Sequence, residues 1–127
     1  MSEEQNRQTV ERYWEALERN DFDRAMVELH DDFVEIYPQS GERVAGKDNY
    51  LALISNHPTF PGIEVRRHIG RDDLWVTEAR FDYAKDGSPT WEVCEIQELN
   101  DGKISRITVI FGAPFEPAEW RARWVTR

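Results

Sequence analysis

Residues 91–112, WEVCEIQELNDGKISRITVIFG, are the stretch that most constrains how this chain can fold. Two runs rich in β-branched and aromatic residues are separated by Asn100-Asp101-Gly102. Asn, Asp and Gly accept the positive φ angles of a tight turn, so the pattern predicts a hairpin of two long strands. Side chains alternate between the two faces of a strand. One face of the first run therefore carries Trp91, Val93, Glu95, Gln97 and Leu99.

Glu95 is the most informative residue of this hairpin, because it shares its face with apolar neighbours. The second run offers a similar apolar face, with Ile107, Val109 and Phe111. A carboxylate buried between such faces is costly unless it has a partner. Two roles stay open: a neutral acid that faces a ligand, or an ionised group paired with Arg67, which interrupts an apolar face at 63–69.

Three segments before residue 58 repeat apolar side chains at helical spacing, and each predicts an amphipathic helix. The first has Val10, Tyr13, Trp14 and Leu17, the second Phe22, Ala25, Met26 and Leu29, and the third Tyr50, Leu53, Ile54 and His57. Asp21 and Asp48 are suitable caps for the second and third helices. We expect residues 30–32 to end the second helix, 33–37 to form a short strand and 39–46 to form a loop.

From Gly62 onward the apolar period becomes alternating, which predicts four strands at 63–69, 74–83, 91–99 and 104–111. The joints at 70–73, 85–89 and 100–102 are short and rich in turn residues, so neighbouring strands should be antiparallel. Helices followed by a strand meander predict an α+β fold in a single domain, residues 1–127. A strongly curved sheet wrapped over helices forms a cone, and its open end is a natural pocket.

Charge and cysteine content exclude several classes of function. The formal net charge of −9 argues against nucleic acid and anionic membranes, which attract basic surfaces. Cys94 is the only cysteine, so no intrachain disulfide can form, as expected for a cytoplasmic protein. No apolar run predicts a signal peptide or a membrane span. We find no phosphate-binding loop, no metal motif and no sign of a cofactor; adjacent residues in 30–32 diverge rather than converge.

Four segments together resemble the SnoaL-like branch of the NTF2-like superfamily. They are RYWEALERNDF, LHDDFVEIYPQSG, the glycine at position 46 and DGKISRITVIFG, and the resemblance covers nearly the whole chain. It implies a cone of three N-terminal helices packed in a strongly curved antiparallel sheet. This fold hosts cyclases, isomerases, dehydratases, epoxide hydrolases and non-catalytic binding modules.

The ketosteroid isomerases of this superfamily imply three site residues. Their oxyanion-hole tyrosine falls on Tyr13 and their oxyanion-hole acid on Glu95, while the position of their catalytic base is occupied by Tyr37. The polyketide cyclases take a base from the last strand, where this chain has aliphatic residues and Phe111. The epoxide hydrolases use an Arg-x-Asp, which corresponds here to Val93-x-Glu95.

The resemblance implies a pocket for a small, largely apolar molecule, with catalytic candidates Tyr13, Glu95 and Tyr37. The expected ligand-binding residues are Trp14, Thr77, Val93, Gln97, Val109, Phe111, His57 and Arg67. The implied chemistry is that of a cofactor-free isomerase, cyclase or dehydratase acting by acid–base catalysis on a carbonyl compound. The alternative is a non-catalytic ligand-binding or protein-interaction module. Apolar residues on the opposite strand face, Cys94, Ile96 and Ile110, predict a homodimer.

Overall fold

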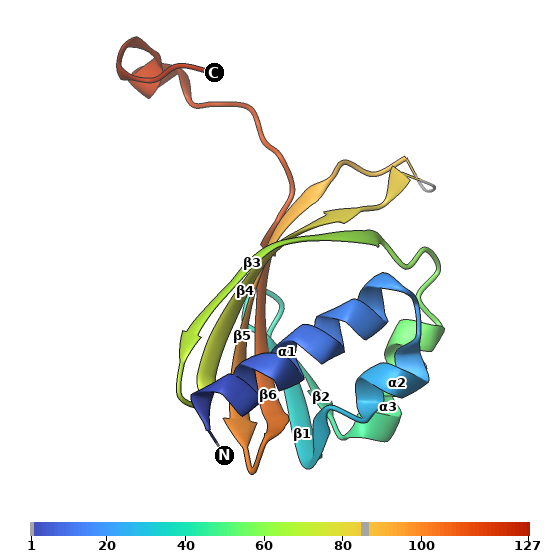
Figure 1. Cartoon of the computed structure of the whole chain (residues 1–127). Coiled ribbons are helices and arrows are strands. Elements are labelled where there is room, and N and C mark those ends of the chain that lie inside the picture. The colour runs from blue at the N-terminus through green and yellow to red at the C-terminus, as the bar shows by residue number, and fades with distance from the viewer. Residues whose placement is uncertain (1, 85–86) are drawn as a thin grey trace.

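The computed structural model describes residues 2–84 and 87–127 and has three helices on one side of a curved sheet (Figure 1). The helices are α1 (Glu3–Glu18), α2 (Phe22–Met26) and α3 (Lys47–Ser55). The strands are β1 (Leu29–Tyr37), β2 (Glu42–Ala45), β3 (Gly62–Arg71), β4 (Leu74–Asp82), β5 (Trp91–Asn100) and β6 (Lys103–Gly112). They form one six-stranded sheet in the order β2-β1-β6-β5-β4-β3. The predicted α+β class and the curved sheet over helices are confirmed.

The predicted hairpin joins β5 and β6. Its two turn residues, Asp101 and Gly102, have φ angles of 52° and 75°, as a two-residue hairpin turn requires. The strands pair in antiparallel register, which places Glu95 opposite Val109. The neighbouring pairs β3–β4 and β4–β5 are antiparallel as well, as predicted. Lys85 and Asp86, part of the turn expected at 85–89, lie outside the described residues.

The first strand differs most from the prediction. β1 begins at Leu29, so residues 30–32 lie in the strand and do not end α2. The backbone N–H of Ile104 donates to the carbonyl of Glu28 at 2.9 Å, which draws this segment into the sheet beside β6. The β1–β6 pair is parallel. The expected loop at 39–46 contains β2, which pairs with β1 and forms the edge of the sheet.

The third helix has a different cap from the one expected. Its N-cap is Gly46, with φ of 90°, and not Asp48, which lies in the first turn of α3. Glycine suits this position because it adopts a positive φ without steric cost. The helix ends at Ser55, so His57 lies beyond it in the following loop. None of the helices in the described residues is long and apolar enough to cross a membrane.

A β-bulge in β3 reverses the faces that simple alternation predicts. Val65 pairs with Ala79 and Arg67 pairs with Glu78, so Arg66 is an extra residue. Beyond the bulge, the position expected to face inward faces outward. Arg67 is therefore exposed, and its Nε lies 2.8 Å from Glu78 Oε1. Of the two roles left open for Glu95, the ion pair with Arg67 is excluded for this reason.

The outer face of the sheet carries a continuous cross-strand row of β-branched, mostly apolar side chains. The register aligns Ile36, Thr108, Ile96, Val76 and Ile69 across five strands. We call these five residues the outer apolar row. Cys94 and Ile110 form a pair beside it, and Ile110 is exposed. Homodimerisation through this face stays a prediction.

A buried carboxylate fixes the two N-terminal helices to the start of the sheet. Glu28 is 2% exposed and accepts from Arg12 Nη2 at 3.1 Å and Arg24 Nη1 at 2.6 Å. Burial alone raises the pKa of Glu28, but the hydrogen bonds from both arginines outweigh burial and lower it. Glu28 is therefore ionised at neutral pH and links α1, α2 and the chain entering β1.

Replacing Glu28 tests how much its carboxylate contributes to the stability of the fold. Glu28→Gln keeps the shape but removes the charge that both arginines bind, so we expect the free energy of unfolding to fall by about 2 kcal/mol in urea denaturation at pH 7. As a control, Glu11→Gln removes a surface ion pair with Arg7 and should change stability by less than about 0.5 kcal/mol. Equal effects of the two changes would contradict the linking role of Glu28.

Candidate functional site

The concave face of the sheet and the helices enclose a pocket of about 390 Å³. Its walls are mostly aromatic and aliphatic, and strands β1, β3, β4, β5 and β6 together with α1 and α3 contribute to them. Two carboxyl groups, Glu35 and Glu95, also line it. A largely apolar cavity with a few converging polar groups is the usual form of a small-molecule site.

Glu95 lies on β5 with its side chain inside the cone, as predicted. It is 5% exposed, and its Oε1 has no hydrogen-bond partner among the described residues. Burial raises the pKa of Glu95 well above its ordinary value, and the nearby Glu35 carboxyl raises it further. The raised pKa favours the protonated form of Glu95, and within residues 2–84 and 87–127 its Oε1 has no partner.

Glu35 is a site residue that the sequence reasoning missed. It lies on β1, is 2% exposed and accepts a hydrogen bond from the Tyr37 hydroxyl. Burial raises the pKa of Glu35 to about 7, although the bond from Tyr37 acts in the opposite direction. The pKa of Tyr37 is raised by burial and by the neighbouring Glu35 charge, so the phenol keeps its proton and serves as the donor. Glu35 is thus poised between its two charge states near neutral pH.

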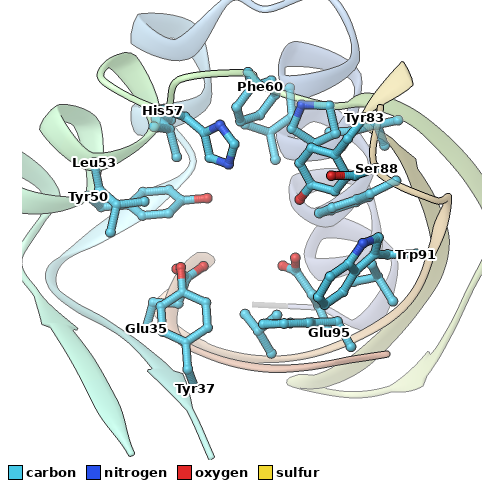
Figure 2. Close-up of a pocket in the computed structure, with 18 residues that line it drawn as sticks. Glu35, Tyr37, Tyr50, Leu53, His57, Phe60, Tyr83, Ser88, Trp91 and Glu95 are labelled. Atoms are coloured by element: carbon cyan, nitrogen blue, oxygen red, sulfur yellow. The ribbon is translucent and has the colours of Figure 1, made fainter. Parts of the chain in front are cut away.

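The register explains why the two carboxyl groups share one pocket. Glu35 is paired with Ile107 on β6, and Glu95 is paired with Val109 on the same strand. Their strands lie on either side of β6, so their backbones are about 10 Å apart. Because the sheet is curved, the side chains converge on its concave side. Figure 2 shows both carboxyl groups directed into the same central space.

Tyr13, expected to share an oxyanion hole with Glu95, is hydrogen-bonded to a second tyrosine. The Tyr13 hydroxyl lies 2.5 Å from the hydroxyl of Tyr50 on α3, and both rings are buried. Tyr50 lines the pocket and directs its hydroxyl into it (Figure 2), whereas Tyr13 is not one of the lining residues. Burial is the main cause that raises the pKa of both phenols well above the ordinary value. Tyr50 thus presents a protonated hydroxyl to a ligand, and Tyr13 orients it.

Three expected ligand-binding residues form a hydrogen-bond network outside the pocket. Trp14 Nε1 donates to Gln97 Oε1 at 3.1 Å, and Gln97 Nε2 donates to Thr77 Oγ1 at 3.2 Å. All three are fully buried, and Thr77 is also bonded to His68 Nδ1. None of them lines the cavity. Their role in the structure is to satisfy polar groups of the core beneath the site.

Of the remaining expected ligand-binding residues, four line the pocket and one does not. Val93, Val109 and Phe111 line the pocket on β5 and β6, and His57 lines it from the loop after α3. The His57 ring stacks on Tyr83, with centroids 5.8 Å apart, and its Nδ1 accepts from the backbone N–H of Thr59. Arg67 lies outside the pocket, because the bulge in β3 turns its side chain to the outer face of the sheet. Within residues 2–84 and 87–127, no group of three or more His, Cys, Asp or Glu side chains is placed to hold a metal ion.

The signal that could have found Glu35 was present in the sequence. Phe33, Glu35 and Tyr37 alternate along β1, just as Val93, Glu95 and Gln97 alternate along β5. In both strands a single carboxylate lies between uncharged residues of the same face. Phe60, which also lines the pocket, carries no comparable signal because it lies in the loop between α3 and β3.

Comparison with known proteins supports the resemblance noted in the sequence. Residues 10–107 match the family model of the SnoaL-like domain. An NTF2-like protein of unknown function from Burkholderia xenovorans LB400 is 39% identical, with a TM-score of 0.84 over 98% of this chain and 95% of that one. No curated protein sequence matches this chain.

Two solved structures with named activities share the fold. A candidate ketosteroid isomerase from Kribbella flavida is 23% identical, with a TM-score of 0.90 over 98% of this chain and 90% of that one. An LEH-like epoxide hydrolase from M. tuberculosis is 22% identical, with a TM-score of 0.70 over 87% and 84% of the two chains. At these identities the likeness concerns the fold.

The raised pKa of Glu35 predicts a pH dependence of stability. The unfolded chain holds this proton with a pKa near 4.5 and the folded chain with a pKa of about 7, so the folded state binds more protons between these values. The stability contribution is complete below pH 4.5 and is lost as pH rises through about 7. Relative to Glu35→Gln, the native chain should lose about 3 kcal/mol of unfolding free energy between pH 5 and 8.

Urea denaturation at a series of pH values measures this difference. Glu98→Gln, on the outer face of the sheet, is the matched control and should follow the pH profile of the native chain. A difference between native chain and Glu35→Gln that does not change with pH would contradict the raised pKa.

Proposed function

The chain belongs to the SnoaL-like domain family, and from that premise we propose that its pocket carries out cofactor-independent proton transfer on a small, largely apolar carbonyl compound. Isomerisation, by movement of a proton between two carbons, is the simplest reaction of this kind. The observation that carries the proposal is the pair of buried carboxyl groups, Glu35 and Glu95, that face one apolar cavity. Such a pair provides a base and an acid in one place.

Glu35 is suited to act as the base. Its pKa of about 7 leaves a substantial ionised fraction at neutral pH, and a base of this strength is matched to proton abstraction beside a carbonyl group. The Tyr37 hydroxyl holds the carboxylate in place. In the proposed step Glu35 removes a proton from the carbon next to the carbonyl, and the electrons of that C–H bond form an enolate. The same carboxyl group then returns the proton to another carbon, so no cofactor is consumed.

Glu95 and Tyr50 are suited to stabilise the enolate oxygen. Both groups keep their protons at neutral pH, and both line the cavity. Hydrogen-bond donors fixed in a dry cavity stabilise a developing negative charge more strongly than water does. Tyr13 supports this arrangement through its bond to Tyr50.

This assignment accounts for the tyrosine at the position where the ketosteroid isomerases have their base. Tyr37 is too weak an acid to exchange protons near neutral pH, and it donates to Glu35, two residues earlier on the same strand face. The carboxylate of Glu35 therefore lies on the same strand face, two residues before the position of the isomerase base.

Hydrogen exchange of a simple ketone tests the proposal. With 2-tetralone as probe in D₂O, proton NMR should show that the native chain accelerates exchange of the protons beside the carbonyl. Glu35→Gln should lower the rate by about 10²–10⁴-fold because it removes the base. Glu95→Gln should lower it by about 10–10³-fold, since an amide is a weaker donor to an enolate than a carboxylic acid. Glu98→Gln, on the opposite face of β5, is the control and should keep the native rate.

The same probe distinguishes the alternative function. Quenching of the fluorescence of Trp91, which lines the cavity, reports binding separately from exchange. Binding of 2-tetralone without exchange above the buffer rate would support a non-catalytic ligand-binding module and contradict the catalytic proposal. Full exchange activity in Glu35→Gln would show that another group is the base.

The pKa of Glu35 also predicts the pH profile of this reaction. The exchange rate at low probe concentration should rise with pH and level off above about 7, as Glu35 loses its proton. Glu95 remains protonated over this range because its pKa is raised well above normal. A rate that is constant between pH 5 and 8 would contradict Glu35 as base.

A further inference from the structure

The C-terminal segment, residues 113–127, leaves the body of the protein after β6. Figure 1 shows it in red, extending away from the sheet and ending in the short helix η2 (Glu119–Trp124). Three aromatic side chains of this segment are largely exposed: Phe115 at 78%, Trp120 at 75% and Trp124 at 70%. We call residues 113–127 the arm.

Two prolines explain why the arm projects. Pro114 and Pro117 fix their own φ angles, lack N–H donors and favour extended conformations in the residues before them. Ala118, which precedes η2, is extended as well, with φ of −70° and ψ of 133°. The segment between β6 and η2 is thus a stiff spacer that holds the aromatic residues away from their own sheet.

Exposed aromatic residues at this density indicate a binding surface. Single soluble chains rarely leave several large apolar side chains together in water. Tryptophan is also the residue type most enriched among those that dominate protein interfaces. Since the spacer directs the arm away from its own body, the surface that covers it belongs to another molecule.

Charge identifies the kind of partner. The last eight residues of the arm contain three arginines, at 121, 123 and 127, and no acidic residue. The whole chain has a net charge of −9, and the arm contributes +1, so residues 1–112 carry −10. A basic, aromatic arm on an acidic body is complementary to the body of a second copy. An anionic membrane would attract the arm but repel the rest of the chain.

The second copy also offers an apolar surface of matching character. The outer apolar row crosses the sheet, and Ile69 in it, together with Leu74 and Ile110 nearby, is about half exposed. Ile110 lies only three residues before the arm begins. The apolar outer face and the arm are therefore continuous along the chain, so a two-fold axis would let each copy both give and receive an arm.

We propose that the arm is a dimerisation element: its aromatic residues dock on the outer apolar row of a second copy of this chain, reciprocally in a two-fold dimer. This inference does not depend on the chemistry of the pocket. In the proposed dimer, the arm makes a contact in addition to any contact between the two sheet faces. The exposed tryptophans and the adjacent arginines both take part in that contact.

Sedimentation velocity of the full chain between 1 and 100 μM tests the proposal. The native chain should form a dimer, and Trp120→Ala/Trp124→Ala should weaken association at least 10-fold. Leu74→Glu, on the receiving face, should weaken it to a similar degree. Val27→Ala removes an equally exposed apolar side chain outside both surfaces and should leave the dissociation constant unchanged. Raising NaCl from 0.05 to 0.5 M should weaken the dimer, since its charges are complementary.

Each opposing result overturns the proposal. A native chain that stays monomeric at 100 μM excludes the arm as a dimerisation element. Unchanged association of Trp120→Ala/Trp124→Ala shows a dimer held by the sheet face alone, and unchanged association of Leu74→Glu places the arm elsewhere. A monomer that binds vesicles containing 30% phosphatidylserine, and loses this binding in the double tryptophan variant, assigns the arm to a membrane surface.

Discussion

Two carboxyl groups are buried on the concave side of one sheet, and much of the surrounding structure serves to make that arrangement tolerable. Burying an ionised carboxylate is costly, so the protein holds Glu95 neutral and keeps Glu35 near the midpoint of its titration. Each carboxyl disfavours the charge on the other, which keeps at most one of them ionised near neutral pH. The Tyr37 hydroxyl then stabilises the charge on Glu35, the one of the two that ionises first. An acid and a base are thereby distinguished by environment and not by residue type.

The buried polar side chains beneath the pocket are hydrogen-bonded to one another. Gln97 uses its amide to join Trp14, Thr77 and the carbonyl of Trp75 in a closed network below the pocket. Tyr13 is satisfied by Tyr50 in the same way. Against this background the Oε1 atom of Glu95 stands out, because it has no partner within the part of the chain that the structure describes. Glu95 itself is one of the residues that line the pocket.

The sequence predicted the elements that depend on local periodicity and missed those that depend on pairing. The β5–β6 hairpin and the inward direction of Glu95 follow from a turn motif and simple alternation. The same alternation failed for Arg67, because a bulge one residue earlier reversed the faces, and no local pattern marks that bulge. Residues 30–32 were expected to end a helix, but pairing with β6 drew them into a strand. Glu35 follows the same alternation as Glu95 and lies within the strand predicted at 33–37, but only the parallel pairing of that strand with β6, which no local pattern reveals, places it in the pocket.

The parallel pairing of β1 with β6 has a consequence for how the site comes into being. β1 ends at Tyr37 and β6 begins at Lys103, so the two strands that bring Glu35 near Glu95 meet only after a long loop has closed. Contacts between distant parts of a chain form slowly, because the entropy of loop closure must be overcome first. On a ribosome, the helices and β1 emerge well before their central partner is synthesised. The pair of carboxyl groups is therefore assembled late, and until then the apolar inner face of β1 lacks the strand against which it packs.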